Sequence, residues 1–291
     1  MTSPNSCKVL EPDRCDLGLQ TCAYCDPIWN AIQAEALAES EKDSALRLWL
    51  EDSVLKHRQL EESLRYLLDE KLFLGEPMML QQELLAAISA EPAIRVAILE
   101  DLRAIRCQDP ATTGYLTPFL LFKGFLALEA YRLAHWLWKD GRAMFARRIQ
   151  SRVSEVFGVD IHPAACIGHG VFIDHATGVV IGETAEIGNG VVLLHGVTLG
   201  GTGKESGNRH PKVGDGVLIG ARALILGNIR IGDRAKIGAG STVVTNVPEE
   251  ATVVGVAARE VHRKSVSPTP NPLAAVSQIS GHASTPSPSI Q

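Results

Sequence analysis

The sequence predicts an α+β protein in which an all-helical domain precedes a parallel β-helix of hexapeptide repeats. Between Ile161 and Pro248 an aliphatic residue recurs every six positions, and glycine directly follows most of these residues. The segment before Val159 has helical periodicity instead. A helix repeats its face about every 3.6 residues and a strand every two, so neither explains a period of six.

The aliphatic positions trace the β-helix. They are Ile161, Ile167, Ile173, Ile181, Ile187, Leu193, Leu199, Val213, Ile219, Ile225, Ile231, Ile237 and Val243. Each hexapeptide supplies one short strand and one corner, so three make a triangular coil of about 18 residues with the aliphatic side chains inside. A single coil cannot bury these side chains, so the fold must be stabilised by stacking of neighbouring coils.

The repeat is interrupted twice. Two extra residues bulge at 174–178, and a longer loop leaves the repeat at 200–212. Departures from a rigid scaffold are where binding and chemistry concentrate. His175 and His195 occupy the same place in the register, so we expect them on one face, one coil apart. We expect one edge of the prism to gather Asp174, His175, His195, Arg209 and His210.

The amino-terminal residues 1–27 contain four of the six cysteines and three prolines, and they lack helical periodicity. We predict a flexible extension. Its cysteines could bind zinc as four thiolates, or the last two could form a redox pair. Their spacing departs from that of a zinc ribbon, which favours reduced, unliganded thiols. These residues are Cys7, Cys15, Cys22 and Cys25.

Residues 28–158 are predicted to form the helical domain. Amphipathic segments cover 93–106, 118–139 and 142–156, and Gly141 ends the second of them. We expect this domain to pack against other subunits, to contribute to the substrate site and to cover the open first coil, because solenoid ends need capping.

The β-helix is predicted over 159–262, followed by a disordered tail at 263–291, since residues from 265 onward hold five prolines and no charged side chain.

The 28 Lys and Arg against 33 Asp and Glu give a net charge of −5, which argues against a nucleic-acid or membrane-surface role. We find no apolar run near 18 residues and no secretory signal, and expect the cytoplasm.

Several motifs are more specific than the repeat itself. They are Asp109-Pro110-Ala111, the segment 123–138, and the runs 159–165, 174–178, 198–204 and 209–212. In these motifs the chain resembles the serine acetyltransferases of the hexapeptide-repeat acyltransferase superfamily. The resemblance extends from about residue 28 to residue 263.

The resemblance implies a left-handed β-helix and a homotrimer with active sites between neighbouring prisms, commonly paired into a hexamer. It implies acetyl transfer from acetyl-CoA to the hydroxyl of L-serine, giving O-acetylserine and CoA for cysteine biosynthesis. It also implies feedback inhibition by L-cysteine, with acetyl-CoA as co-substrate and no metal.

The resemblance also assigns residues. A serine hydroxyl needs a base, and His175 matches the catalytic histidine of the family, while Asp160 matches the carboxylate that orients it. The positions that match serine-binding residues are Asp109, Asp174, Arg209 and His210. The positions that match the CoA-binding face are Gly201, Ala221, Lys236 and Ala239.

Two other enzyme classes share a β-helix of this kind. Other hexapeptide acyltransferases, which act on sugar or xenobiotic hydroxyls, lack this helical domain. A γ-type carbonic anhydrase would bind zinc through three histidines, including a close His-x4-His pair that this sequence lacks.

Members of the resembled family often end in an isoleucine that enters O-acetylserine sulfhydrylase. Here Gln291 follows Ile290, and this departure puts such a complex in doubt.

Overall fold

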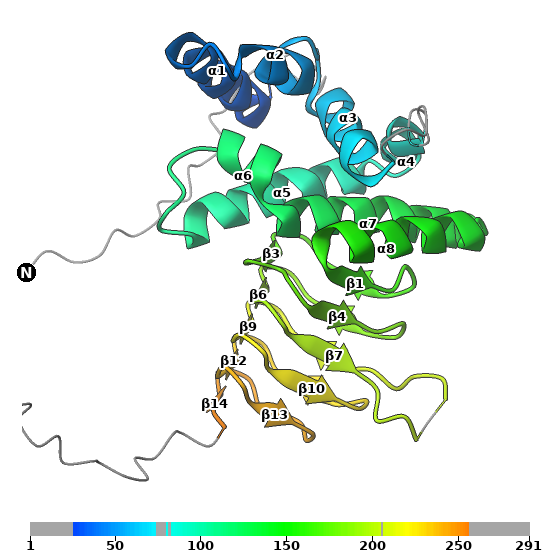
Figure 1. The fold of residues 1–291 in the computed structure, drawn as a ribbon. Coiled ribbons are helices and arrows are strands. Elements are labelled where there is room, and N and C mark those ends of the chain that lie inside the picture. The colour runs from blue at the N-terminus through cyan, green and yellow to red at the C-terminus, as the bar shows by residue number, and fades with distance from the viewer. Residues whose placement is uncertain (1–25, 74–79, 81–82, 205, 256–291) are drawn as a thin grey trace, which may run out of the picture. The chain divides into compact units, whose positions relative to one another are not determined.

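Helices occupy the first half of the described chain and short strands the second (Figure 1). The structure is a computed structural model that describes residues 26–73, 80, 83–204 and 206–255. All but the last two residues of the predicted extension, its cysteines included, and the whole predicted tail lie outside the described residues. None of the described helices combines the length and the apolar character that a bilayer span needs.

The helices are α1 (Pro27–Lys42), α2 (Arg47–Leu50), the π-helical turn η1 (Glu51–Leu55), α3 (Leu60–Leu72), α4 (Glu83–Ala90), α5 (Ala93–Gln108), α6 (Leu116–Leu121), α7 (Lys123–Lys139) and α8 (Ala143–Phe157). The predicted helical character is confirmed, with one error. We predicted a single helix over 118–139, but the chain is extended at Phe122, where ψ is 103°, so α6 and α7 are separate helices.

The break at Phe122 lets α7 begin against the first coil of the β-helix. Gly124, in the first turn of α7, lies so close to Ile173 that a Cβ would overlap its carbonyl oxygen. Only glycine permits this approach. The pattern of apolar residues runs through Phe122 without interruption, which is why the sequence did not reveal the break.

The strands are β1 (Val159–Ile161), β2 (Cys166–Ile167), β3 (Phe172–Ile173), β4 (Val179–Ile181), β5 (Glu186–Ile187), β6 (Val192–Leu193), β7 (Thr198–Gly200), β8 (Lys212–Val213), β9 (Leu218–Ile219), β10 (Leu224–Leu226), β11 (Arg230–Ile231), β12 (Lys236–Ile237), β13 (Thr242–Val243) and β14 (Thr252–Val253). They form sheet A (β1-β4-β7-β10-β13), sheet B (β2-β5-β8-β11) and sheet C (β3-β6-β9-β12-β14). All the pairs are parallel.

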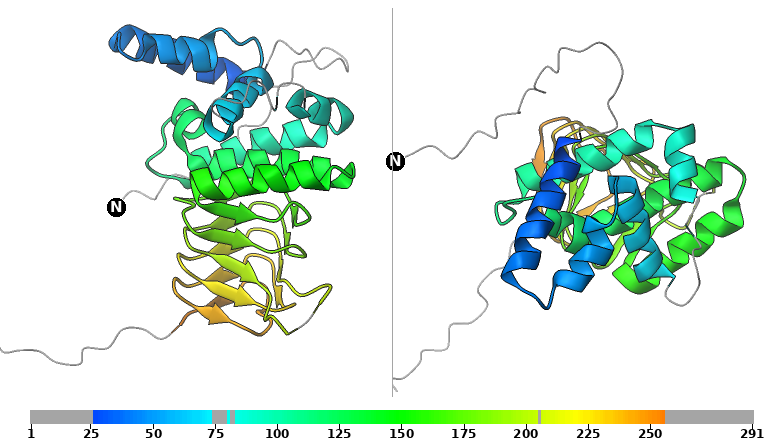
Figure 2. Two further views of the ribbon diagram at one scale, coloured as in Figure 1. Left: turned by 45° about the vertical axis from the view of Figure 1, so that its right-hand side comes forward. Right: turned by 90° about the horizontal axis from the view of Figure 1, so that it is seen from above.

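The register stacks aliphatic on aliphatic. In sheet A, Ile161 pairs with Ile181, Ile181 with Leu199, and Leu199 with Ile225. These side chains are almost completely buried. Burial of each branched side chain contributes about 1.5–3 kcal/mol, but only when the next coil is in place. The predicted parallel β-helix is confirmed, and Figure 2 shows its coils stacked below α7 and α8.

The turns between sheets form three edges along the prism. We name them the histidine edge (174–178, 194–197, 220–223 and 238–241), the arginine edge (162–165, 182–185, 201–211 and 227–229) and the third edge (168–171, 188–191, 214–217 and 232–235). Sheet A lies between the histidine and arginine edges. The long segment 201–211 projects from the right-hand side of the prism in Figure 1.

A buried ionic network joins the helices to the first coil. Arg132 of α7 donates to the carboxylate of Asp101 and, at 2.8 Å, to the carbonyl of Gly168. Asp101 also accepts a hydrogen bond from the backbone N–H of Val171 at 2.7 Å. Glu129 is fully buried beside Arg132. The helical region is therefore fixed to the coil through polar contacts as well as apolar packing.

Candidate active site

The turn at 174–178 raises His175 out of the prism. His175 and Ala176 both have left-handed backbones, at φ 56° and 58°. The turn is closed by hydrogen bonds of 2.6 Å from Ala176 N–H to Asp174 carbonyl and from Thr177 N–H to His175 carbonyl. Left-handed backbone is unfavourable for residues with a Cβ, so strain is concentrated here. As a result the His175 side chain is 73 % exposed.

The imidazole of His175 lies beside an acid and a second imidazole. Its Nε2 is 3.7 Å from a carboxylate oxygen of Asp174. The ring of His195, one coil further along, lies edge-on with its centroid 5.9 Å away. The prediction that the two histidines share a face is confirmed. Nδ1 of His195 is buried and has no hydrogen-bond partner among the described residues.

Asp160 lies in β1, next to the turn that carries His175. A 2.7 Å hydrogen bond joins Gly178 N–H to the carbonyl of Gly158, so the end of the His175 turn is fixed to the start of β1. Asp160, two residues into that strand, is half-buried and accepts a 2.7 Å hydrogen bond from the side-chain amide of Gln150. Sequence reasoning assigned no role to Gln150, because a lone glutamine on a helix carries no motif.

The amino-terminal end of α7 also holds the turn. The ammonium of Lys123 donates to the hydroxyl of Thr177. Gly124 packs on the carbonyl of Ile173, just before the turn. The 123–138 motif carried part of the family resemblance, yet it gave no sign of this contact. The helices therefore constrain the His175 turn from outside the β-helix.

Three of the four predicted CoA positions lie on or next to the histidine edge. Ala221 and Ala239 occupy successive turns below His195, and Gly240 N–H donates to the Ala221 carbonyl at 2.8 Å. Lys236 is exposed on β12, which leads into the last of these turns. Gly201 is separate from them, since it begins the long segment of the arginine edge.

The arginine edge is built around Thr184. Its hydroxyl accepts hydrogen bonds from the backbone N–H groups of Arg209 and His210, at 3.0 and 3.2 Å, and lies 2.9 Å from Nδ1 of His210. The guanidinium of Arg209 donates to Glu183 at 2.9 Å. His210 is only 6 % exposed, and its ring covers Gly182, where a Cβ would overlap it. The sequence identified Arg209 and His210 but not the two residues that hold them.

Charge at this edge is set by burial and by ion pairing. Burial, together with the nearby Arg209 charge, lowers the pKa of His210, so its imidazole is neutral at neutral pH. The hydrogen bond from Arg209 lowers the pKa of Glu183, which remains a carboxylate. The edge therefore presents a guanidinium held on one side by Glu183, next to a neutral imidazole.

Asp109 follows the last residue of α5. Its carboxylate accepts hydrogen bonds from Ala111 N–H at 2.9 Å and from the Thr112 hydroxyl at 2.7 Å, which makes a tight Asx turn. The carboxylate is therefore fixed in direction. An ionised carboxylate has about four acceptor sites, so it can still accept from a further group.

The expectation that one edge gathers Asp174, His175, His195, Arg209 and His210 is wrong. His175 and His195 lie on the histidine edge, whereas Arg209 and His210 lie on the arginine edge, across sheet A. Each hexapeptide advances the chain by one edge. The loop that carries Arg209 begins one hexapeptide after the turn that carries His195, and so reaches the next edge. The six-residue spacing alone therefore predicts that His175 and Arg209 lie on different edges.

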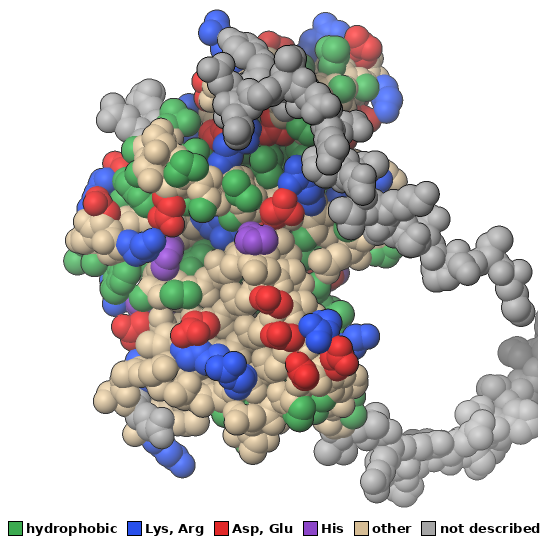
Figure 3. Space-filling model, turned by 180° about the vertical axis from the view of Figure 1, so that it is seen from behind, with side chains coloured by type: hydrophobic (Ala, Val, Ile, Leu, Met, Phe, Trp, Pro, Cys, Tyr) green, Lys and Arg blue, Asp and Glu red, His purple; other side chains and the backbone are tan. Residues whose placement is uncertain are grey.

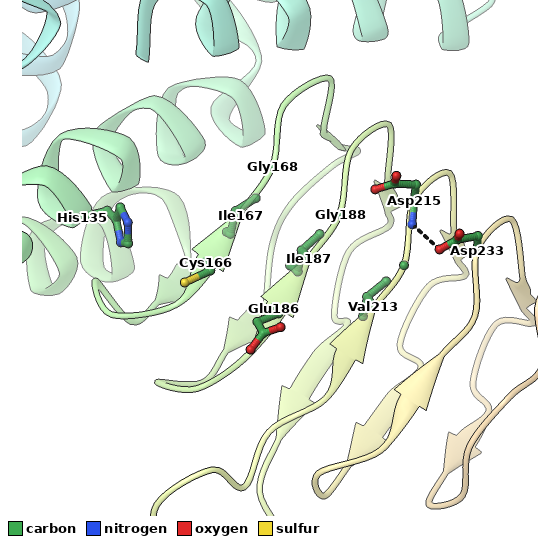
Figure 4. Close-up of a pocket in the computed structure, with 11 residues that line it drawn as sticks. His135, Cys166, Ile167, Gly168, Glu186, Ile187, Gly188, Val213, Asp215 and Asp233 are labelled. Carbon is green, nitrogen blue, oxygen red and sulfur yellow. Dashed lines mark hydrogen bonds between the residues drawn. The ribbon is translucent and has the colours of Figure 1, made fainter. Parts of the chain in front are cut away.

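A separate pocket lies on sheet B and the third edge (Figure 4). Its lining includes His135, Glu186, Asp215 and Asp233, and none of the predicted site residues. Asp233 accepts from Asp215 N–H at 3.0 Å, so this carboxylate serves the coil stack. Within the described part of the chain, no group of three or more His, Cys, Asp or Glu side chains is arranged to hold a metal ion.

Comparison with known proteins identifies relatives of both halves of the chain. Residues 28–130 match the family model "Serine acetyltransferase, N-terminal", and residues 210–245 match "Bacterial transferase hexapeptide (six repeats)". Serine acetyltransferase 2 of Arabidopsis thaliana is 51 % identical over 234 residues, or 79 % of this chain and 72 % of that protein. Serine acetyltransferase of Escherichia coli K12 is 47 % identical over 245 residues, or 83 % and 89 %.

Solved structures agree. Soybean serine acetyltransferase complexed with serine has a TM-score of 0.77 at 52 % identity, covering 80 % of this chain and 96 % of that one. The Brucella abortus enzyme in complex with coenzyme A has a TM-score of 0.77 at 47 % identity, covering 81 % and 96 %. A serine acetyltransferase in complex with cysteine has a TM-score of 0.76 at 48 % identity, covering 81 % and 99 %.

Proposed function

The chain belongs to the serine acetyltransferase family and is an acetyl-CoA-dependent serine O-acetyltransferase, and we propose how its two edges share this reaction. The histidine edge supplies the base. The arginine edge supplies the group that binds the carboxylate of the substrate. The single observation that carries the proposal is the separation of these residues by the width of sheet A.

His175 is the general base. The imidazole takes the proton of the serine hydroxyl as the oxygen attacks the carbonyl carbon of the thioester, giving a tetrahedral oxyanion. The carbon–sulfur bond then breaks, and CoA leaves as a thiol with the proton from the imidazolium. The exposure of His175 supports this role, because a buried imidazole could not reach the hydroxyl. Asp160 orients the ring and stabilises the imidazolium.

Four residues hold the amino acid. Asp109 and Asp174 bind its ammonium group, and Arg209 grips its carboxylate with the assistance of His210. The planar guanidinium suits a carboxylate because it can make two parallel hydrogen bonds. The contacts with Glu183 and with the carbonyl of Gly207 support this role, since they fix the guanidinium and leave three of its five N–H donors for the ligand. The complexes of relatives with serine and with cysteine are consistent with one amino-acid site and with L-cysteine as its feedback inhibitor.

CoA lies along the histidine edge, where Ala221 and Ala239 leave room beside the coils and Lys236 offers a charge. A complex of the Brucella abortus relative with coenzyme A supports binding of CoA to this fold. Gly201 contributes from the arginine edge. A CoA site that includes Gly201 as well as Ala221 and Ala239 again requires the arginine edge of one copy to lie against the histidine edge of another.

The two edges meet between copies of the chain in a homotrimer. The outward side chains of sheet A between Asp160 and the last coil are uncharged: Val180, Thr198, Leu224, Leu226 and Thr242. Sheet B instead presents Glu186, Lys212 and Arg230, and the face turned away from the viewer in Figure 1 carries charges of both signs (Figure 3). In a three-fold ring each contact joins two different patches. The histidine edge of one copy can thus face the arginine edge of the next.

We also propose a higher assembly and a location. Trimers pair into a hexamer through the helical regions. The proposed compartment is the cytoplasm. The thiol of Cys166 is exposed and forms no disulfide among the described residues, which suits a reducing environment.

The test is complementation between two inactive variants, His175→Ala and Arg209→Ala. Each homotrimer should be nearly inactive below the serine KM of the wild type. Random mixed trimers should recover about a quarter of wild-type activity, because half of the copies carry each intact edge and a site needs both. The readout is release of CoA thiol from acetyl-CoA with L-serine, after unfolding and refolding the two chains together. No recovery in trimers shown to be mixed would refute a site shared between copies.

A further inference from the structure

One contact reaches from the helical region directly to a proposed catalytic group. The side-chain amide nitrogen of Gln150, on α8, lies 2.7 Å from a carboxylate oxygen of Asp160. Gln150 is half-buried, and it is the hydrogen-bond partner of this carboxylate among the described residues. The contact joins residues only ten positions apart, across the turn from α8 to β1.

The backbone on both sides of this contact is fixed. On α8, Ile149 and Val153 are buried on the faces next to Gln150, and Arg152 donates at 2.8 Å to the carbonyl of Leu72. Gly158 ends the helix in a left-handed conformation at φ 68°, so β1 starts at once. The amide of Gln150 is therefore held in one place relative to β1 rather than reaching Asp160 by chance from a mobile surface.

The chemistry of the contact suits an orienting role. A carboxylate turns about one bond, so a donor on one oxygen also fixes the direction of the other. An amide is a neutral donor, so the negative charge of Asp160 is retained. A lysine or arginine in this place would cancel part of the charge that an imidazolium needs.

We propose that Gln150 is a positioning residue of the acetyl transfer, which fixes one oxygen of Asp160 so that the other faces the His175 imidazole. This inference rests on the roles given above to His175 and Asp160. It adds a functional reason for the helix-to-coil junction, because α8 then sets the geometry of the base. Other groups also face His175, namely the carboxylate of Asp174, the ring of His195 and, through Thr177, the ammonium of Lys123.

Two near-isosteric variants test the proposal. Gln150→Met keeps the length but removes the donor, and kcat should fall about 10-fold, a minor part of the roughly 10²–10⁴-fold that a general base supplies. The KM for serine should stay within about twofold, because no substrate contact is lost. The acid limb of the kcat profile should move to lower pH, since a freely turning Asp160 stabilises the imidazolium less.

Gln150→Glu should move the same limb in the opposite direction. A second carboxylate beside Asp160 adds negative charge near the imidazolium, so the limb moves to higher pH. A purely structural role for Gln150 predicts no displacement of the limb in Gln150→Met, whereas the added charge of Gln150→Glu displaces it in either case. Ser151→Ala, on the exposed side of α8, is the matched control and should behave as wild type.

Each outcome is decisive when trimer formation and CoA binding are measured alongside. Wild-type kcat and an unmoved acid limb in Gln150→Met overturn the proposal, and so does a loss of kcat that accompanies loss of assembly. Opposite shifts in the two assembled variants support it. Retained activity in His175→Ala would instead overturn the proposed base, so the two failures are distinguishable.

Discussion

The histidine and arginine edges belong to the same prism but are built in opposite ways. On the histidine edge the key side chain is exposed, its backbone is left-handed, and a neighbouring imidazole nitrogen has no hydrogen-bond partner within the described residues. On the arginine edge His210 is nearly buried, and the Thr184 hydroxyl joins it to Arg209. The histidine edge thus exposes its key side chain to solvent, whereas the arginine edge fixes its key side chains by hydrogen bonds within the chain.

The difference suits the two proposed tasks. A general base has to reach a substrate proton, and bonds that would fix the imidazole would also occupy it. A group that binds a carboxylate gains affinity when it is held in place beforehand, because less freedom is lost on binding. Kinetic parameters should therefore divide between the edges, with kcat sensitive to the histidine edge and KM to the arginine edge.

The largest effect is expected at His175. The variant His175→Ala should lose about 10³-fold in kcat, within the range that a positioned base contributes, while its oligomeric state stays that of the wild type. The measurement is thiol release with saturating serine and acetyl-CoA. His169→Ala is the control, because His169 is also exposed but lies on the third edge. Turnover of His175→Ala close to that of the control would remove the distinction between the edges.

The sequence predicted the parts of the molecule that repeat. The six-residue period placed the inward aliphatic side chains from Ile161 to Val243, though not Val253 of β14, and it placed His175 and His195 on one face. It failed where a contact depends on elements that no repeat connects. Gln150 and Lys123 come from helices, and their partners Asp160 and Thr177 come from the first coil, so only the packing of helix on coil reveals the pairs.

The separation of Arg209 from His175 is a different kind of error. Counting hexapeptides from Leu193 to Leu199 would have assigned the long loop to the next edge. We instead expected residues with related chemistry to gather within one chain. The proposed site is completed by a second copy, and grouping residues within one chain cannot reveal such a site, because one chain then holds only half of it.

A matched pair of threonine variants sharpens the comparison. Thr184→Val removes the hydroxyl that joins Arg209 and His210, and the KM for serine should rise about fivefold, as expected for about 1 kcal/mol of lost hydrogen bonding. Thr177→Val removes the contact of Lys123 with the His175 turn, and kcat should fall by a similar factor. Steady-state kinetics measures both. A lower kcat in Thr184→Val with a higher KM in Thr177→Val would contradict the division of kcat and KM between the edges. The same change in both variants would contradict it as well.

The smallest kinetic effect, and the clearest effect on stability, is expected at Glu129, which lies in neither edge. It is fully buried beside Arg132, and both carboxylate oxygens lack hydrogen-bond partners among the described residues. Burial, reinforced by the charge of Asp101, raises the pKa of Glu129 well above its usual value. Above about pH 4.5 the unfolded chain releases this proton while the folded chain keeps it, so folding stability falls as pH rises.

Glu129→Gln removes that loss because an amide does not titrate. The variant and the wild type should have similar stability near pH 4, and the variant should gain by up to about 1 kcal/mol per pH unit above that, until the folded-state pKa of Glu129 is reached. Urea unfolding across pH 4–8 measures the difference, with kcat and KM unchanged at each pH. A variant less stable than the wild type at every pH would mean that Glu129 is charged in the folded protein and paired with Arg132. A changed kcat would mean that the buried pair of Glu129 and Arg132 also affects the base.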